Sequence, residues 1–188
     1  MNPFVAAFSR TMEKEGEYVL EPGPGGETFM GISRPYWPSW PGWHIIDRYK
    51  AENRTDGYRR SGILGLVKTF YLENFWNRIQ GDKLSELSLK ISYEVFDTAV
   101  NMGVMQSTKF LQTGLNMQRE YTTAYPELVV DGLLGAATLR ALDLYLASST
   151  GFMENNENIL LKVLNGEQYI HYKNNPRHSR NRGWFLRT

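Results

Sequence analysis

The sequence predicts a mainly α protein with a short irregular or β-turn segment after its first helix and a helical C-terminal half. Three observations support this fold class. Apolar residues recur at helical spacing near the N-terminus and through most of the chain after Ser61, whereas Gly and Pro concentrate between residues 20 and 43. A chain of 188 residues with 41% hydrophobic residues is also large enough to bury a core.

The first helix is marked at both ends. Asn2 suits an N-cap, Pro3 suits the first helical position, and Gly16 suits the position after the last turn. The apolar residues between them repeat at helical spacing, as Phe4, Ala7, Phe8, Thr11 and Met12. We therefore expect an amphipathic helix that buries this stripe.

Two proline-rich segments follow this helix. The run VLEPGPGGETFMGIS (residues 19–33) predicts turns with a short hairpin or irregular strand, because Gly and Pro interrupt it repeatedly. In RPYWPSWPGWHIIDRY (residues 34–49) Trp alternates with Pro, so we expect no regular helix there.

Helical spacing returns after Ser61 in a series of amphipathic segments. The segments cover residues 63–79, 89–103, 104–116, 136–148 and 158–175. In the first of them the expected buried stripe is Leu64, Val67, Tyr71 and Phe75, and Trp76 is also expected in the core.

Composition and charge exclude several classes of function. With 21 Lys+Arg against 20 Asp+Glu, the net charge of +1 provides no electrostatic attraction for nucleic acid. The chain has no cysteine, and His44, His171 and His178 lack the spacing of metal ligands, so we expect no metal and no cofactor. No apolar run approaches the roughly 20 residues of a transmembrane helix.

The N-terminal segment differs from a secretory signal peptide. Arg10, Glu13 and Lys14 stand where such a signal needs an uninterrupted apolar stretch. We therefore expect synthesis in the cytoplasm without a signal peptide.

One glutamate of the first helix falls on the apolar stripe. On a wheel of about 100° per residue, Glu15 lies within roughly 20° of Phe8, whereas Glu13 points about 160° away from Glu15. Burial and the negative end of the helix dipole both raise the pKa of a carboxyl group, so Glu15 suits a general acid near neutral pH. The alternative is a surface position in which Glu15 pairs with Lys14 or Arg10.

Short motifs along almost the whole chain occur in an order that resembles a known enzyme family. EGEYVLEPGPGGETFMGIS is similar to a motif of Glu-Gly-Gly-Tyr, a Pro-rich turn, Gly-Gly-x-Thr and Gly-Ile. This motif is typical of the glycoside hydrolase family 108 muramidases, lysozyme-like enzymes often described as secretion activator proteins. Further motifs with counterparts in that family are NFWNRI, VFDTAVNMG and RGWFLRT. The segments KFLQTGLN and VDGLLGAATLRAL resemble its appended peptidoglycan-binding region.

The resemblance implies a lysozyme-like fold, with a catalytic lobe at residues 1–95 and a helical peptidoglycan-binding lobe at 96–188 that share a core. It implies hydrolysis of the β-1,4 bond between N-acetylmuramic acid and N-acetylglucosamine in peptidoglycan, with Glu15 as the catalytic acid. Thr28 matches the threonine of the motif. We expect Thr28 either to hold the attacking water or to hydrogen-bond within its own turn.

Two positions depart from the family pattern. Glu17 stands where the family has its second glycine and brings another carboxylate near Glu15. In LEPGPGG, Glu21 takes the first acidic place of an Asp-Pro-x-Asp-Pro-Gly-Gly pattern, but the second acid is absent. An Asp orients the water in related viral lysozymes. If the missing acid does this work in the family, the chain has a substitute, for which Glu21 and Glu27 are the nearby candidates, or it is slow or inactive.

Several aromatic and polar residues are candidates for substrate binding. Tyr18 belongs to the family motif, and the tryptophans of the proline-rich loop offer flat faces for sugar rings. Those tryptophans are Trp37, Trp40 and Trp43, of which we expect at least two to cover the core and one to touch substrate. Asp97 and Asn101 lie one turn apart on an apolar helix. We assign both to the substrate-binding set, with a structural hydrogen-bonding role as the alternative.

Two other functions fit the same residues. The missing acid favours a catalytically inactive peptidoglycan-binding accessory protein of a secretion or phage system. A single catalytic glutamate also suits a lytic transglycosylase, which forms an anhydro product without water. In each case the expected partner is the peptidoglycan glycan strand, reached in the cell wall after release through a holin or export by a secretion apparatus.

Overall fold

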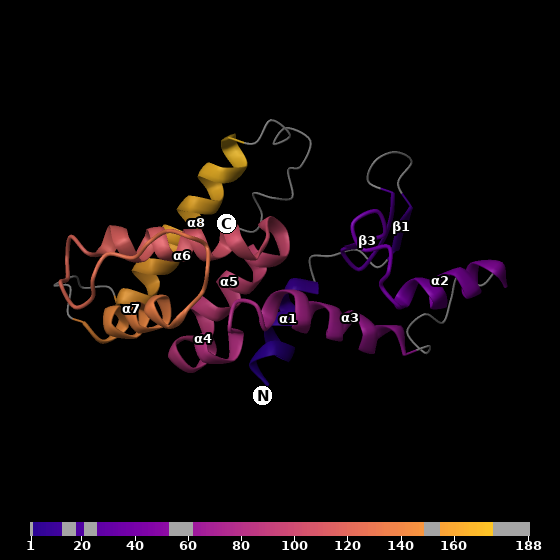
Figure 1. The fold of residues 1–188 in the computed structure, drawn as a ribbon, viewed down its shortest axis with the longest axis horizontal. Coiled ribbons are helices and arrows are strands. Elements are labelled where there is room, and N and C mark those ends of the chain that lie inside the picture. The colour runs from indigo at the N-terminus through magenta and orange to yellow at the C-terminus, as the bar shows by residue number, and fades with distance from the viewer. Residues whose placement is uncertain (1, 13–17, 21–25, 53–61, 149–154, 175–188) are drawn as a thin grey trace. The chain divides into compact units, whose positions relative to one another are not determined.

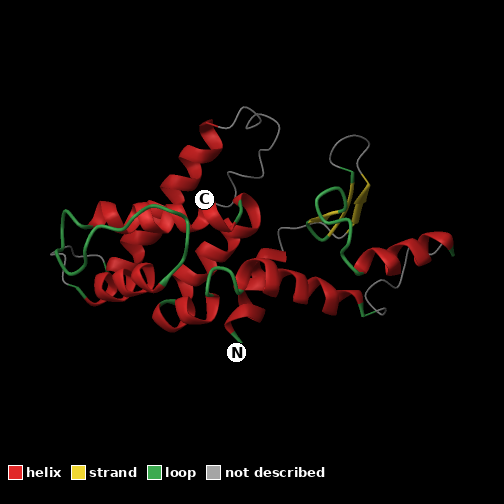
Figure 2. Ribbon diagram, viewed as in Figure 1, coloured by secondary structure: helices red, strands yellow, loops and turns green. Residues whose placement is uncertain are grey.

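The computed structural model describes residues 2–12, 18–20, 26–52, 62–148 and 155–174. The chain divides into two compact units, residues 1–74 and 75–188. Among the described residues helices dominate both units, and strands occur only in the first (Figures 1 and 2). The expected lobe boundary at residues 95–96 falls inside the second unit. A division of catalytic and wall-binding roles between lobes therefore stays a prediction.

The described part of the first unit consists of helices and short strands that alternate along the chain. In chain order the elements are α1 (Pro3–Met12), β1 (Tyr18–Leu20), β2 (Glu27–Phe29), β3 (Ile32–Ser33), α2 (Gly42–Ala51), α3 (Ile63–Tyr71) and the π-helical turn η2 (Leu72–Trp76). The last of these continues from the first unit into the second.

Helix α1 begins where the sequence predicts and buries most of the expected stripe. Asn2 Oδ1 accepts a hydrogen bond from Val5 N at 3.2 Å, which is the expected N-cap contact. The buried residues are Phe4, Ala7, Phe8 and Thr11. The Phe8 ring packs edge-on against Tyr71 of α3, with 5.6 Å between the ring centroids. Gly16, expected just past the helix, lies outside the described residues.

The glycine-rich segment after α1 forms a three-stranded antiparallel sheet with β2 in the centre. Met30 (φ 45°) and Gly31 (φ 78°) make the two-residue loop between β2 and β3. Positive φ at both positions is what a type I′ hairpin turn requires. The Tyr71 hydroxyl donates to Met30 O at 2.7 Å and so ties the hairpin to α3. The expected hairpin is confirmed.

The expectation of no regular helix in residues 34–49 is wrong for their second half, which belongs to helix α2. All the prolines of that segment, at positions 35, 38 and 41, precede the helix. Pro41 has a φ of −60° and stands directly before Gly42, where a ring-fixed φ favours helix initiation. The prolines are therefore confined to the irregular segment before α2, and the helix itself contains none.

The buried stripe of α3 differs from the predicted one at both ends. Val67 and Tyr71 are buried as predicted, whereas Leu64 is half-buried and Ile63 takes the buried position at the start of the helix. Instead of Phe75, which is half-buried, the next fully buried residue is Trp76, five positions after Tyr71. A π turn adds one residue to a helical turn, and η2 covers this point. A constant period of 3.6 residues cannot predict the shift.

The second unit is a bundle of helices, which Figure 1 shows packed around α5 and α6. Its described helices are α4 (Gly81–Leu87), α5 (Leu89–Met102), α6 (Val104–Gln118), α7 (Ala136–Ala147) and α8 (Asn156–Asn174). Ser88 Oγ caps α5 by accepting from Ile91 N at 3.0 Å, and Gly103, with a φ of 89°, ends it as predicted. No helix in the described ranges has the length and apolar character needed to span a bilayer.

Two glycines of the second unit predict opposite effects on stability. A Cβ at Gly81 would overlap the buried Trp76 indole, whereas a Cβ at Gly166 on the exposed side of α8 would meet nothing within 4 Å. We expect Gly81→Ala to lower the free energy of unfolding by about 1–3 kcal/mol through overpacking. Gly166→Ala should raise it by about 0.5–1 kcal/mol, because glycine disfavours a helix interior. Urea unfolding followed by circular dichroism measures both, and a gain in stability from Gly81→Ala would contradict the Trp76 contact.

Candidate functional site

The residues expected to carry catalysis are distributed around the sheet of the first unit. Glu15 and Glu21 lie outside the described residues, so their assignment stays a prediction. Tyr18 is described by its backbone, which pairs with Phe29 of β2. Thr28 is the middle residue of β2 and pairs with Val19 on one side and with Ser33 on the other.

The pleat of β2 separates its side chains onto two faces of the sheet. Glu27 and Phe29 share one face, and Thr28 lies on the opposite face, because successive side chains of a strand alternate. Thr28 is half-buried, and its hydroxyl makes no hydrogen bond with any residue in the described ranges. The alternative that Thr28 bonds within its own turn is therefore not the arrangement seen. Its hydroxyl remains available to a water molecule or a substrate.

Glu27, a candidate for the missing acid, is held by two cations on its own face of the sheet. Arg34 Nη1 contacts Glu27 Oε2 at 2.7 Å, and Lys50 of α2 contacts Oε1. The Glu27 side chain is only 9% exposed. These contacts join β2 to α2 and place Glu27 across the sheet from Thr28. Glu27 is therefore poorly placed to act on the same water as Thr28.

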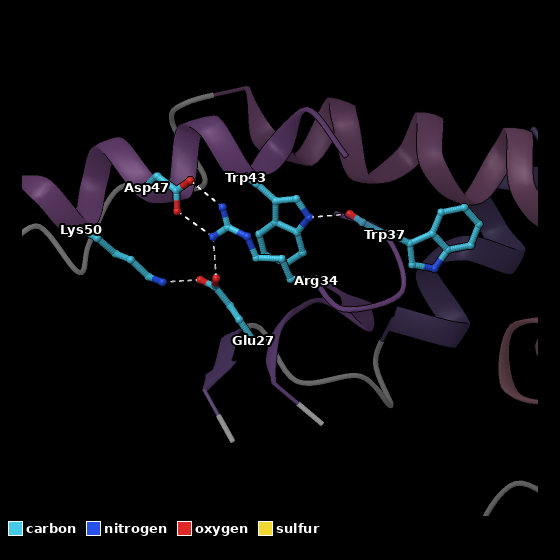
Figure 3. Close-up of polar contacts among 6 residues, drawn as sticks. All are labelled: Glu27, Arg34, Trp37, Trp43, Asp47 and Lys50. Carbon is cyan, nitrogen blue, oxygen red and sulfur yellow. Dashed lines mark hydrogen bonds and ion pairs between the residues drawn. The ribbon is translucent and has the colours of Figure 1, made fainter. Parts of the chain in front are cut away.

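Arg34 is the centre of this polar network (Figure 3). Besides Glu27, its guanidinium binds Asp47 of α2 through two parallel hydrogen bonds of 2.7 Å. The hydrogen bonds with Asp47 and then with Glu27 raise the pKa of Arg34, and the hydrogen bond from Arg34 holds the pKa of Asp47 below its ordinary value. Such a two-pronged contact fixes direction as well as distance, so it sets the position of α2 on the sheet.

Trp43 connects this network to the proline-rich loop. Its ring lies under the Arg34 guanidinium, 5.1 Å from the guanidinium carbon to the ring centroid. Its Nε1 donates to Trp37 O at 2.7 Å (Figure 3). Trp43 is 2% exposed and has no face open to a sugar ring. Its position suits core packing and positioning of the loop, through its contacts with Arg34 and Trp37.

Trp40 is the second covered tryptophan. Its ring stacks on Phe29 at 6.1 Å and meets Trp43 edge-on at 5.1 Å. A Cβ on Gly42 would overlap the Trp40 ring, so glycine at the start of α2 makes room for it. Trp40 is 6% exposed, and its Nε1–H has no hydrogen-bond partner within the part of the chain that the structure describes.

Trp37 is the tryptophan of this loop with surface open to a ligand. It is 37% exposed, and its ring edge is fixed against Phe70 of α3 at 4.8 Å and an interplanar angle of 89°. The neighbouring Tyr36 is 78% exposed. The expectation that at least two of the three tryptophans cover the core agrees with these positions. Contact of Trp37 with substrate stays a prediction.

A groove of about 230 Å³ lies beside Trp37, within the first unit. The proline-rich loop forms one wall, and α3 with the first part of η2 forms the other. The lining residues are Trp37, Ser39, Trp40, Pro41, Leu66, Thr69, Phe70, Glu73 and Asn74. Sequence reasoning did not single out Glu73. The available signal was its helical spacing, three residues after Phe70 and seven after Leu66, which places these side chains on one side of the helix.

Asp97 and Asn101 belong to α5 of the second unit. Asn101 Nδ2 donates to Asp97 O at 2.7 Å and approaches Asp97 Oδ2 at 3.4 Å. Asp97 is buried, whereas Asn101 is half-buried. The contacts suit the structural alternative, while contact with substrate stays a prediction. Across the described ranges, no three or more His, Cys, Asp or Glu side chains gather as metal ligands would.

The Arg34–Asp47 pair predicts a pH-dependent contribution to stability. Because the hydrogen bond from Arg34 lowers the folded-state pKa of Asp47, the contribution is present at neutral pH and is lost as the pH falls through that lowered pKa. Asp47 is half-exposed, so we expect Asp47→Asn to lower the free energy of unfolding by only about 0.5–1 kcal/mol at pH 7. The difference from wild type should shrink towards pH 3, as urea unfolding at several pH values would measure.

Asp143→Asn is the matched control, because Asp143 is exposed on α7 and makes no ion pair with the residues described. An equal, pH-independent effect of both substitutions would contradict the role of the Arg34 pair.

Comparison with known proteins identifies the family. The model of the family described as Glycosyl hydrolase 108 matches residues 8–103, just over half of the chain. A solved structure of SagA from Brucella abortus is similar with a TM-score of 0.64 and 23% sequence identity, covering 98% of this chain and 88% of that one. At this identity the likeness concerns the fold, and the expected mainly α, lysozyme-like class is confirmed. No curated protein sequence matches the chain significantly. The family match spans Glu15, the sheet and the groove, and this chain belongs to the glycosyl hydrolase 108 family of glycosidases.

Proposed function

We propose that this glycosidase cleaves the β-1,4 bond between N-acetylmuramic acid and N-acetylglucosamine in peptidoglycan, with Glu15 as the general acid. The observation that carries the proposal is the family match over residues 8–103, which includes Glu15 and the motif around it. The position of Glu15 on the apolar side of the helical wheel supports the same side chain independently, because a poorly hydrated carboxyl group keeps its proton near neutral pH.

In the proposed reaction, Glu15 donates its proton to the glycosidic oxygen as the bond from that oxygen to the anomeric carbon breaks. A water molecule adds its oxygen to the anomeric carbon, and a second carboxylate accepts the proton that this water loses. The hydroxyl of Thr28 is assigned to hold the water, which its position on the face of β2 opposite Glu27 and its lack of a partner among the described residues support. Since Glu27 lies on the opposite face, Glu21 is the remaining candidate for the second carboxylate.

Substitution of Glu15 tests the proposal directly. Glu15→Gln keeps the size of the side chain and removes the proton, so we expect release of reducing muropeptides from purified peptidoglycan to fall by about 10²–10⁴-fold. Glu13→Gln is the matched control, because the wheel directs Glu13 to solvent, and it should cleave like wild type. Mass analysis of the fragments and circular dichroism of each variant provide the readouts.

The products also separate the alternatives. Equal cleavage by wild type and Glu15→Gln would show that the acid is misassigned. Anhydro products from wild type would indicate a transglycosylase. Binding to peptidoglycan with no fragments would indicate an inactive accessory protein, the function that the missing second acid favours.

Thr28 gives a separate test of the water-holding role. Thr28→Val keeps the shape and removes the hydroxyl, and we expect kcat to fall by about 10²-fold, as for the loss of one well-placed catalytic hydrogen bond. Thr28→Ser retains the hydroxyl and should keep most of the activity. Similar kcat values for Thr28→Val and wild type would assign Thr28 to strand packing alone.

A further inference from the structure

The groove beside Trp37 combines an aromatic wall with hydrogen-bonding groups in a volume of about 230 Å³. We propose that it is a subsite for a single N-acetylhexosamine ring of the glycan, with Trp37 as its stacking surface and Glu73 as its main hydrogen-bond acceptor. This subsite rests on the proposed function, which supplies the glycan. Its volume is below the ~300–1,000 Å³ typical of pockets for drug-sized ligands, so one sugar ring is the appropriate size.

Trp37 is held as a rigid platform. Its backbone N donates to Ser33 O at 2.9 Å, and its carbonyl accepts from Trp43 Nε1 at 2.7 Å. The edge-on contact with Phe70 fixes the ring itself. An aromatic face whose rotamer is already fixed loses little entropy on binding, and it suits the apolar face of a pyranose ring.

Glu73 gives the groove its polar specificity. It is the one charged side chain among the described lining residues, it is exposed, and no described residue forms an ion pair or hydrogen bond with it. A carboxylate accepts hydrogen bonds only, and sugar hydroxyls and the N-acetyl N–H are donors. Ser39 and Thr69 add two hydroxyl groups to the same lining.

Trp40 contributes an unsatisfied donor to the same lining. Its buried Nε1–H has no acceptor among the described residues, and a buried donor without an acceptor is unfavourable because it has lost its hydrogen bond to water. The subsite assigns a ligand oxygen, from a hydroxyl or the N-acetyl carbonyl, as that acceptor.

Glu73 reaches the groove at ordinary helical spacing, and the π turn accommodates the buried aromatic residues beside it. Leu66, Phe70 and Glu73 follow one side of α3 and η2, and the extra residue of the turn keeps Tyr71 and Trp76 buried at the same time. Asn74 Nδ2 donates to Phe70 O at 2.9 Å and so satisfies a carbonyl at the turn. Single π turns occur frequently at functional sites, where they re-aim side chains.

Binding measurements with a peptide-free sugar test the subsite. The Glu15→Gln variant of the chain is titrated calorimetrically with N,N′,N″-triacetylchitotriose. Double variants that also carry Glu73→Gln or Trp37→Ala are titrated in the same way. We expect each addition to weaken the Kd by about tenfold or more, the scale of one hydrogen bond to a charged group. The controls are Tyr36→Ala, an exposed aromatic outside the groove lining, and Glu86→Gln, an exposed glutamate of α4. Both should leave the Kd within about twofold of the parent.

A kinetic readout separates binding from folding and chemistry. In the otherwise wild-type chain, Glu73→Gln and Trp37→Ala should act on KM for peptidoglycan more than on kcat, with unchanged circular dichroism. An unchanged Kd in both variants would overturn the subsite. So would binding to muropeptides but not to chitotriose, because an aromatic face with a carboxylate also recognises the amine of a stem peptide.

The subsite and the proposed reaction fail in different ways. Glu15-dependent cleavage with a Kd that is independent of Glu73 and Trp37 would overturn the subsite alone. Chitotriose binding that depends on both residues, in a wild-type chain that releases no fragments, would support the subsite and overturn the hydrolysis.

Discussion

The arrangement of the first unit depends on one guanidinium group. Arg34 binds Glu27 of β2 and Asp47 of α2 while its face covers Trp43, and Trp43 in turn holds the carbonyl of Trp37. An exposed ion pair contributes only about 0–1 kcal/mol, so the importance of Arg34 lies in geometry more than in stability. Because its five N–H groups point in fixed directions, the sheet, the helix and the aromatic loop are positioned together.

This network divides the sheet into a structural face, on which the side chains of β2 are engaged, and an opposite face that carries Thr28. On the structural face Glu27 is engaged by two cations and Phe29 by the Trp40 ring, so neither side chain is available to a ligand. On the other face Thr28 presents a hydroxyl with no partner among the described residues. A single strand therefore anchors the core with two side chains and leaves the third, Thr28, for the proposed water-holding role. In the proposed reaction, the second carboxylate would have to reach the water from the Thr28 side.

The sequence predicted features that depend on near neighbours in the chain. The cap and buried stripe of α1, the glycine stop of α5 and the hairpin follow from local rules, and the structure confirms them. The rule that proline breaks helices does not predict α2. Pro41 stands at the start of this helix, where proline is tolerated, and the residues after it are helical. The tryptophans could be assigned only as a group. Their separate roles depend on Arg34, Phe29 and Phe70, and local spacing does not show which of these rings or charges each one meets.

The π turn after α3 is likewise outside the reach of a constant helical period, and it bears on how the side of the groove is built. An uninterrupted α-helix would continue the stripe from Tyr71 to Phe75, whereas the π turn moves the buried position to Trp76. Each later residue is thereby set back by about 100° relative to an α-helix. Tyr71 is fixed by its hydrogen bond to Met30, and Trp76 by Asp82 and the close approach of Gly81. Since both aromatic residues have their own partners, the extra residue of the turn lets both stay buried, while Glu73 and Asn74 within the turn line the groove.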